Sequence, residues 1–132
     1  MPITYHIDQT TRIIHTTCSG QVSMAEVSEH FRELEQAAKR PRQLHVLLDL
    51  SKSTSLPDSN QIKAVSYAIG AIRKSVQFGF CAIVAANDAM FGMSRMLEVF
   101  AAPYFLGVHV FRGAGEAEAW LLEEVQGIRA AG

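Results

Sequence analysis

Residues 80–86 read FCAIVAA, a run of apolar side chains without alternating polar residues. Strands with one face in water alternate, so this run predicts a parallel strand that is covered on both faces. A second short apolar run, LHVLLDL at residues 44–50, predicts another strand near the centre of the sheet. Two buried strands of this kind favour an α/β protein in which helices cover a sheet.

The segments around these two strands supply the remaining elements. A hairpin is predicted over residues 3–18, with its turn at Gln9-Thr10, and a last strand is predicted over residues 108–112. Residues 51–55 are expected to form a polar loop. Apolar residues spaced three and four apart predict four helices, which begin at Ser23-Met24, Pro57-Asp58, Ala89 and Gly115-Glu116.

The predicted order is therefore β-β-α-β-α-β-α-β-α, in a single domain spanning residues 1–132. Strands that alternate with helices pair in parallel through right-handed crossovers, so the sheet is expected to be mostly parallel. The first strand should lie antiparallel at the edge. Ser23 and Glu26 have the spacing of a capping box, and Asn87 stands where it can cap the third helix.

Composition excludes several classes of protein. The 132 residues include 12 Lys and Arg and 13 Asp and Glu, a net charge of −1, so no basic surface for nucleic acid is expected. Hydrophobic residues make up 48%, which excludes a disordered tail. The first residues lack the features of a signal peptide, and no run reaches the ~18 apolar residues needed to span a bilayer. Cys18 and Cys81 lie in apolar runs, which predicts reduced, buried thiols and a cytoplasmic location.

No motif of a known catalytic or metal site occurs. The chain has no phosphate-binding loop, no nucleophile elbow and no HExxH sequence. Its five histidines lack the spacing of metal ligands and are interpreted as hydrogen-bonded structural residues. We therefore predict no catalytic residue, no metal and no cofactor. An enzyme that uses Asp49 or Ser51 at a strand end remains the least favoured hypothesis.

The third helix is the most informative segment for function. On a helical wheel an apolar arc faces an opposite arc that contains Ser94, Arg95 and Glu98. Phe91 falls among the polar residues, beside Arg95, where core packing does not explain it. The apolar arc consists of Met90, Met93, Met96, Leu97, Val99 and Phe100. Two interpretations stay open: the methionines fill irregular gaps in the core, or the helix roofs an apolar pocket or docking patch.

Two quoted segments, GFCAIVAANDAMFGMSRMLEVFA and VHVFRGAGEAEAWL, resemble the SpoIIAA-like group of the STAS superfamily. The resemblance covers residues 3–124 and implies a STAS-like α/β fold, which is similar to the CRAL-TRIO lipid-carrier domain. It also implies a non-catalytic role with an apolar ligand or an association with membranes. Anti-sigma-factor antagonists of the superfamily carry a phosphorylated serine in a D-S-S-G-type turn. Here Ser59 in Asp58-Ser59-Asn60-Gln61 stands nearest to it, without the second serine or the glycine.

The leading hypothesis is a non-catalytic binding module for an amphipathic or lipid-like small ligand. The expected tail contacts are Met93, Met96, Phe100 and Phe105. The expected headgroup contacts are Ser51, Lys52, Arg95 and Arg112, at or near the carboxyl ends of the strands.

The alternative is a regulatory interaction domain of the anti-sigma-factor-antagonist type. Its protein partner would meet the surface of Phe91 and Arg95, or the turn at Ser59. A basic cluster at Lys39, Arg40 and Arg42 suggests peripheral contact with anionic lipid headgroups. A homodimer is compatible with either hypothesis.

Overall fold

The described residues form one sheet with helices on both faces. The structure is a computed structural model and describes residues 2–37 and 43–131, with the side chains of residues 129–131 excepted. The strands are β1 (Ile3–Asp8), β2 (Ile13–Gly20), β3 (Gln43–Ser53), β4 (Gln77–Val84) and β5 (Gly107–Phe111). The helices are α1 (Met24–Ala37), α2 (Ser59–Ile72), α3 (Asp88–Ala101), the short 3-10 helix η1 (Ala102–Tyr104) and α4 (Ala114–Ala131).

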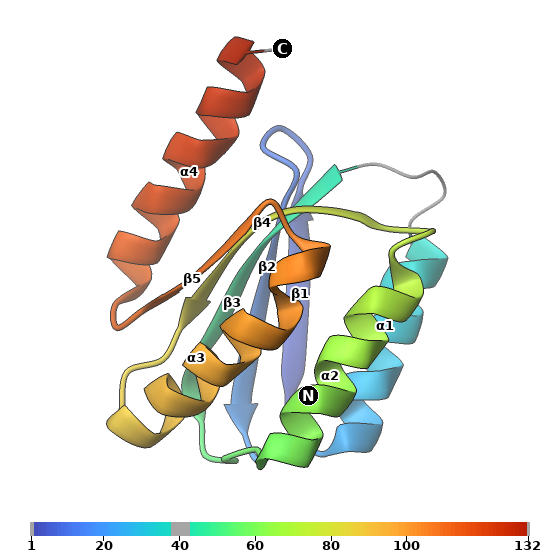
Figure 1. Cartoon of the computed structure of the whole chain (residues 1–132), viewed down its shortest axis with the longest axis vertical. Helices are drawn as coiled ribbons and strands as arrows, with labels where there is room; N and C mark the ends of the chain where they lie inside the picture. The colour runs from blue at the N-terminus through green and yellow to red at the C-terminus, as the bar shows by residue number, and fades with distance from the viewer. Residues whose placement is uncertain (1, 38–42, 132) are drawn as a thin grey trace.

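The sheet topology confirms the predicted α/β architecture. The strand order is β1-β2-β3-β4-β5, with β1 antiparallel to β2 and the other neighbours parallel. Right-handed crossovers between neighbouring strands place all their helices on one face. Figure 1 shows α1, α2 and α3 on the same side of the sheet, with α4 on the other. We call these the front face and the back face.

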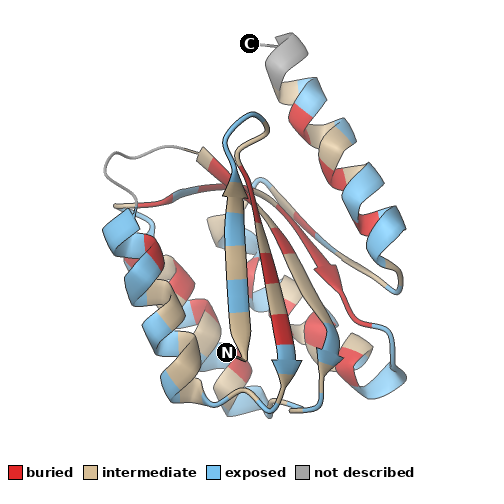
Figure 2. Ribbon diagram, turned by 180° about the vertical axis from the view of Figure 1, so that it is seen from behind, coloured by how far each residue is buried: buried red, intermediate tan, exposed pale blue. Residues whose placement is uncertain are grey.

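The back face is only partly covered. Helix α4 packs against β3, β4 and β5, and Figure 2 shows β1 and most of β2 uncovered on this side. Ile13, the first residue of β2, is buried. The uncovered strands carry polar side chains there, among them His6 and His15, whose rings stack with centroids 4.7 Å apart. The covered part forms a dry core of Ile13, Leu47, Ala82, Val84, Ala117, Leu121 and Val125.

Side-chain caps begin three of the helices. Ser23 and Glu26 form the predicted capping box, in which each side chain accepts the other residue's backbone amide. Asn87 accepts the amide of Met90 at 2.8 Å, as predicted for α3. Asp58 forms a second capping box with Gln61 at the start of α2. Local sequence therefore determines where these helices begin.

Two local predictions are wrong or incomplete. Residues 51–53 continue β3 instead of forming a loop, because they pair with the end of β2 at Ser19 and Gly20. The hairpin turn extends beyond Gln9-Thr10, since the Asp8 carboxylate accepts two turn amides and Arg12 takes a left-handed conformation with φ of 59°. The basic cluster at residues 39–42 lies outside the described residues.

Candidate functional site

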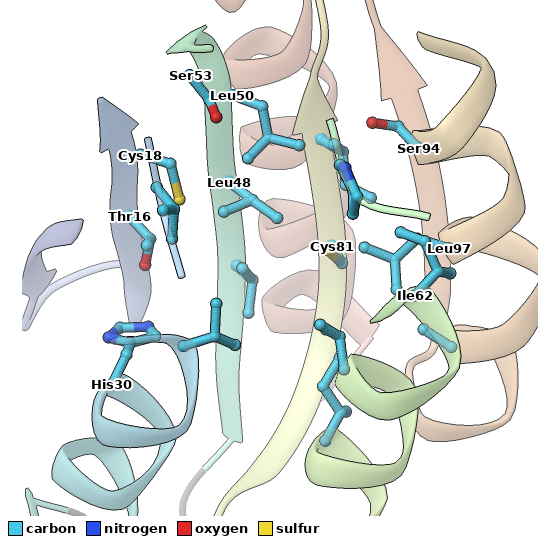
Figure 3. Close-up of a pocket in the computed structure, with 18 of the residues that line it drawn as sticks. Thr16, Cys18, His30, Leu48, Leu50, Ser53, Ile62, Cys81, Ser94 and Leu97 are labelled. Atoms are coloured by element: carbon cyan, nitrogen blue, oxygen red, sulfur yellow. The ribbon is translucent and has the colours of Figure 1, made fainter. Parts of the chain in front are cut away.

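A cavity of about 450 Å³ lies between the front face of the sheet and helices α1, α2 and α3. Figure 3 shows side chains from β2, β3, α1, α2 and α3 that line it. Its apolar wall includes Leu48, Leu50, Ile62, Cys81 and Leu97. A volume of this size falls in the range of roughly 300–1,000 Å³ that small-molecule sites occupy.

Short side chains on opposing walls explain why space remains. The front-facing residues of β2 include Thr16 and Cys18, which reach less far than the leucines of β3. Across the cavity, α3 turns Met90, Ser94, Leu97 and Ala101 inward, and these are its buried residues. Serine and alanine at two of these four positions leave volume that larger residues would fill.

One end of the cavity lies at the carboxyl ends of β2 and β3. Ser53 and Ser55 border it, together with Leu56, whose side chain is 55% exposed. The amide of Val22 donates to Ser55 Oγ at 2.7 Å, which joins the loop before α1 to the loop before α2. Because Leu56 is exposed, this end of the cavity reaches the protein surface.

Ser94 places an unpaired hydroxyl in the cavity. The residue is 2% exposed, and its Oγ has no hydrogen-bond partner. Figure 3 shows this oxygen directed from α3 into the cavity. Ser66 in α2 is also buried, but its Oγ donates to the carbonyl of Ile62 at 3.1 Å. A buried polar group without a partner costs about 1–3 kcal/mol, so Ser94 is a costly residue at this position unless something bonds to it.

His30 contributes a second polar atom with no partner. Its Nδ1 is buried and makes no hydrogen bond, while its ring meets the edge of Tyr5 with centroids 5.1 Å apart. Burial lowers the pKa of His30 below its ordinary value of 6.5, which keeps the imidazole neutral at pH 7. The expectation of a hydrogen-bonded structural histidine is therefore wrong for the Nδ1 of His30. It is correct for His45, whose Nδ1 accepts the amide of Phe80 at 3.0 Å.

The cavity wall carries no formal charge. No Asp, Glu, Lys or Arg occurs among the described residues that line it. Both cysteines lie in the wall as free, buried thiols, as the sequence predicted. Burial raises the pKa of Cys18 to about 11 and that of Cys81 to about 12, so both thiols stay protonated at neutral pH. The site is therefore apolar and neutral, with a few isolated polar atoms.

The predicted tail contacts divide into two groups. Met93 and Phe105 line the cavity. Met96 is partly buried and packs against the buried hydrophobic residues of the front face. Phe100 is 37% exposed, with Lys63 Nζ 5.9 Å from its ring centroid. Helix α3 is therefore rotated from the orientation that the helical wheel suggested.

The predicted headgroup contacts do not line the cavity. Ser51 and Lys52 are exposed at the end of β3, and Ser51 Oγ donates to Asp49 at 2.6 Å. Arg95 is exposed and pairs with Glu98 at 3.2 Å. Ser59, the predicted modification site, is the exposed first residue of α2.

Arg112 belongs to a surface cluster with Asp88 and Phe91. It contacts Asp88 at 2.7 Å and the carbonyl of Ala86 at 3.2 Å. Its guanidinium lies 4.3 Å from the centre of the Phe91 ring. This cation–π contact explains why an aromatic residue stands among the polar residues of α3. Phe91 therefore pairs with Arg112, whereas the sequence suggested Arg95.

The sequence analysis missed the two unpaired polar residues of the cavity. Assigning Ser94 to the solvent side of α3 is wrong, because Met90, Ser94, Leu97 and Ala101 follow the i, i+4, i+7, i+11 spacing of a buried face. That spacing was present in the sequence. It was overlooked because serine was counted as polar. Nothing in the sequence distinguished His30 from the other histidines.

Metal ligands and membrane-spanning helices are two further features that bear on function. Among the described residues, no three His, Cys, Asp or Glu side chains come together in a way that would hold a metal ion. Within the same part of the chain, every helix is too short or too polar to cross a bilayer.

Comparisons with known proteins bear on the fold. No family model matches the sequence, and no curated protein matches it either. The structure is similar to the crystal structure of an uncharacterised protein of the DUF3478 family from Shewanella loihica PV-4, which has a SpoIIAA-like fold. The TM-score is 0.60 at 17% identity, and the match covers 90% of this chain and 91% of the other. The likeness agrees with the five-stranded sheet and with the resemblance noted in the sequence, and it shows that this chain has a SpoIIAA-like fold.

Proposed function

We propose that the protein is a non-catalytic module that binds an apolar or amphipathic small molecule in the front cavity. The observation that carries this proposal is the apolar space of about 450 Å³ beneath α1, α2 and α3. It is about three times the ~150 Å³ of an engineered apolar cavity that takes up benzene. The position of Met93 and Phe105 in its wall supports the hypothesis of a lipid-like ligand.

The energetics favour a chain-like occupant. Each methylene group moved from water into such a wall contributes about 0.8 kcal/mol. Ten buried methylenes would supply roughly 8 kcal/mol before the entropic cost of binding is subtracted, and each further methylene adds to this gain. The exposed Leu56 at the open end offers a first contact for such a chain.

A pair of variants on β2 tests the proposal. Cys18 faces the cavity, so Cys18→Phe places an aromatic ring in the space that the ligand would use. Thr17 is next to it on the same strand and points to the back face, so Thr17→Phe is the matched control. Native mass spectrometry of the purified proteins shows retained ligand. Thermal unfolding with added lauryl alcohol shows binding.

We expect lauryl alcohol to raise the Tm of the wild type and of Thr17→Phe, but not that of Cys18→Phe. Without ligand, Cys18→Phe should keep the Tm of the wild type, because its ring fills existing space. If the wild type neither retains a ligand nor responds to long-chain compounds, the proposal is wrong. A strongly destabilised Cys18→Phe would show that the space is not there to be filled.

One observation favours a regulatory role as a second candidate. Ser59 is exposed at the first position of α2, where the helix dipole favours a negative charge. A phosphate there would repel the neighbouring carboxylate of Asp58, which caps the helix, so the modification would weaken this cap. Mass spectrometry of protein purified from its native cells tests this role, and a Ser59 that is never phosphorylated would rule it out.

A further inference from the structure

The polar atoms of the cavity suggest which class of ligand it selects. Ser94 Oγ–H is a hydrogen-bond donor, and no carbonyl of its own helix or any other described group accepts from it. Ser66 bonds to its own helix, so α-helical geometry does not force a buried serine to stay unpaired. Ser94 Oγ is thus free to donate to a group that enters the cavity.

The charge on that group follows from its surroundings. Ser94 is only 2% exposed, so its hydroxyl has almost no contact with bulk water. No charged side chain lines the cavity among the described residues, so nothing there would neutralise a carboxylate or a phosphate. An unpaired buried charge costs far more than one hydrogen bond returns. A neutral hydrogen-bond acceptor can bond to the Ser94 hydroxyl without the cost of burying a charge.

The position of Ser94 also orients the ligand. In Figure 3 Ser94 lies level with Leu50 and Ser53, near the end where β3 finishes, while Leu48, Cys81 and Leu97 lie deeper. A polar group bonded to Ser94 thus sits just inside the open end. The rest of the molecule then extends along the leucine-rich wall.

We propose that the cavity selects an uncharged chain molecule with one hydrogen-bond acceptor, such as a long-chain alcohol or ester, and that Ser94 Oγ donates to that acceptor. This inference rests on the proposed function, since it needs an occupied cavity. It differs from the expected headgroup contacts at Ser51, Lys52, Arg95 and Arg112, because those side chains lie outside the cavity wall.

Four probes of one chain length test the selection: lauryl alcohol, methyl laurate, lauric acid at pH 8, and dodecane. Dissociation constants come from titration calorimetry or from displacement of a fluorescent fatty probe. We expect the wild type to bind the alcohol and the ester about tenfold more tightly than dodecane. Laurate should bind more weakly than either, because its carboxylate must stay in water or enter the cavity unpaired.

Two serine variants separate the hydrogen bond from general packing. Ser94→Ala should remove the advantage of the alcohol and the ester over dodecane and leave dodecane affinity within about twofold of the wild type. Ser66→Ala is the matched control, because it also replaces a buried helical serine, and it should keep the wild-type order. Ser94→Cys, nearly equal in size but a weak donor, should lose most of the advantage and provides a second variant.

The outcomes distinguish the inference from the function on which it rests. If no probe binds the wild type, both fail. If all probes bind equally, or if laurate binds best, the cavity holds ligands but Ser94 does not select them. If Ser94→Ala still binds the alcohol and the ester more tightly than dodecane, another residue makes the hydrogen bond, and His30 would be tested next.

Discussion

One helix packs on part of the back face of the sheet and forms a buried core there, whereas three helices cover the front face and still leave a cavity. On the back, Ala117, Leu121 and Val125 of α4 follow each other at every fourth residue and are 0–4% exposed. They meet the small Ala82 and Val84 of β4. Large side chains there lie against small ones, and the interface is filled. On the front, short side chains face each other across the space.

The two faces also treat buried polar groups differently. On the back, His45 is 4% exposed and accepts a hydrogen bond from Phe80. On the front, Ser94 Oγ and His30 Nδ1 have no partner. A face that serves stability alone pairs its polar atoms, because leaving them unpaired costs free energy. The unpaired atoms of Ser94 and His30 thus cost the front face some stability, although Ser66 on the same face is paired.

The largest expected effect is a difference in lost stability when one leucine is truncated to alanine on each face. Leu121→Ala removes a side chain that is 0% exposed in the back core, and we expect it to lower the free energy of unfolding by about 3–4 kcal/mol. Leu48→Ala removes a side chain that already borders the cavity. We therefore expect it to lower the free energy of unfolding of the ligand-free protein by about 1 kcal/mol. Urea denaturation measures both. Equal losses would mean that the front is packed as tightly as the back.

A glycine pair gives the next largest effect. A methyl group on Gly79 would overlap the His45 ring, so Gly79→Ala should disrupt the bond from Phe80 and cost about 2 kcal/mol. Gly92 lies on the exposed side of α3, where an added methyl group meets nothing. Gly92→Ala should therefore stabilise the protein by about 0.5–1 kcal/mol. Thermal unfolding measures both, and a neutral Gly79→Ala would show that His45 adjusts without loss.

The smallest expected effect is a change in the pH dependence of stability, caused by His30 on the front face. Burial lowers the pKa of His30 in the folded protein, so the unfolded chain takes up the proton first as the pH falls. The stability that neutral His30 allows is present above about pH 6.5 and is lost as the pH drops from there towards the lower folded value. His30→Gln should flatten this part of the profile, measured as urea midpoints from about pH 8 to pH 5. An unchanged slope would mean that His30 is well hydrated.

The sequence predicted the fold well because each strand and helix has a local pattern. The apolar run in β4 and the caps at Asn87 and Asp58 place their elements with little help from the rest of the chain. The end of β3 was missed because Ser51–Ser53 are polar and form a strand only through pairing with β2. The element types and their parallel pairing were therefore predictable, while the strand order was not.

The site was predictable only in outline. The methionines of α3 left two interpretations open, gap-filling in the core or an apolar pocket, and Met93 does line the cavity. The volume itself depends on the distance between α3 and β2, which no single segment encodes. The pair of Phe91 and Arg112 joins the start of α3 to the end of β5, and only the sheet brings them together. Both features arise from tertiary contacts, so local patterns could not reveal them.

The order of the strands has a consequence for how the chain folds as it is synthesised. Strands that are neighbours in the sheet are also neighbours along the chain, so each new β–α unit can dock on the one made before it. Helix α4 is made after all five strands, and until it docks, Ile13, Leu47 and Val84 remain in contact with water. A nascent chain thus completes its front face first, and the apolar residues of its back face stay exposed to aggregation until α4 docks.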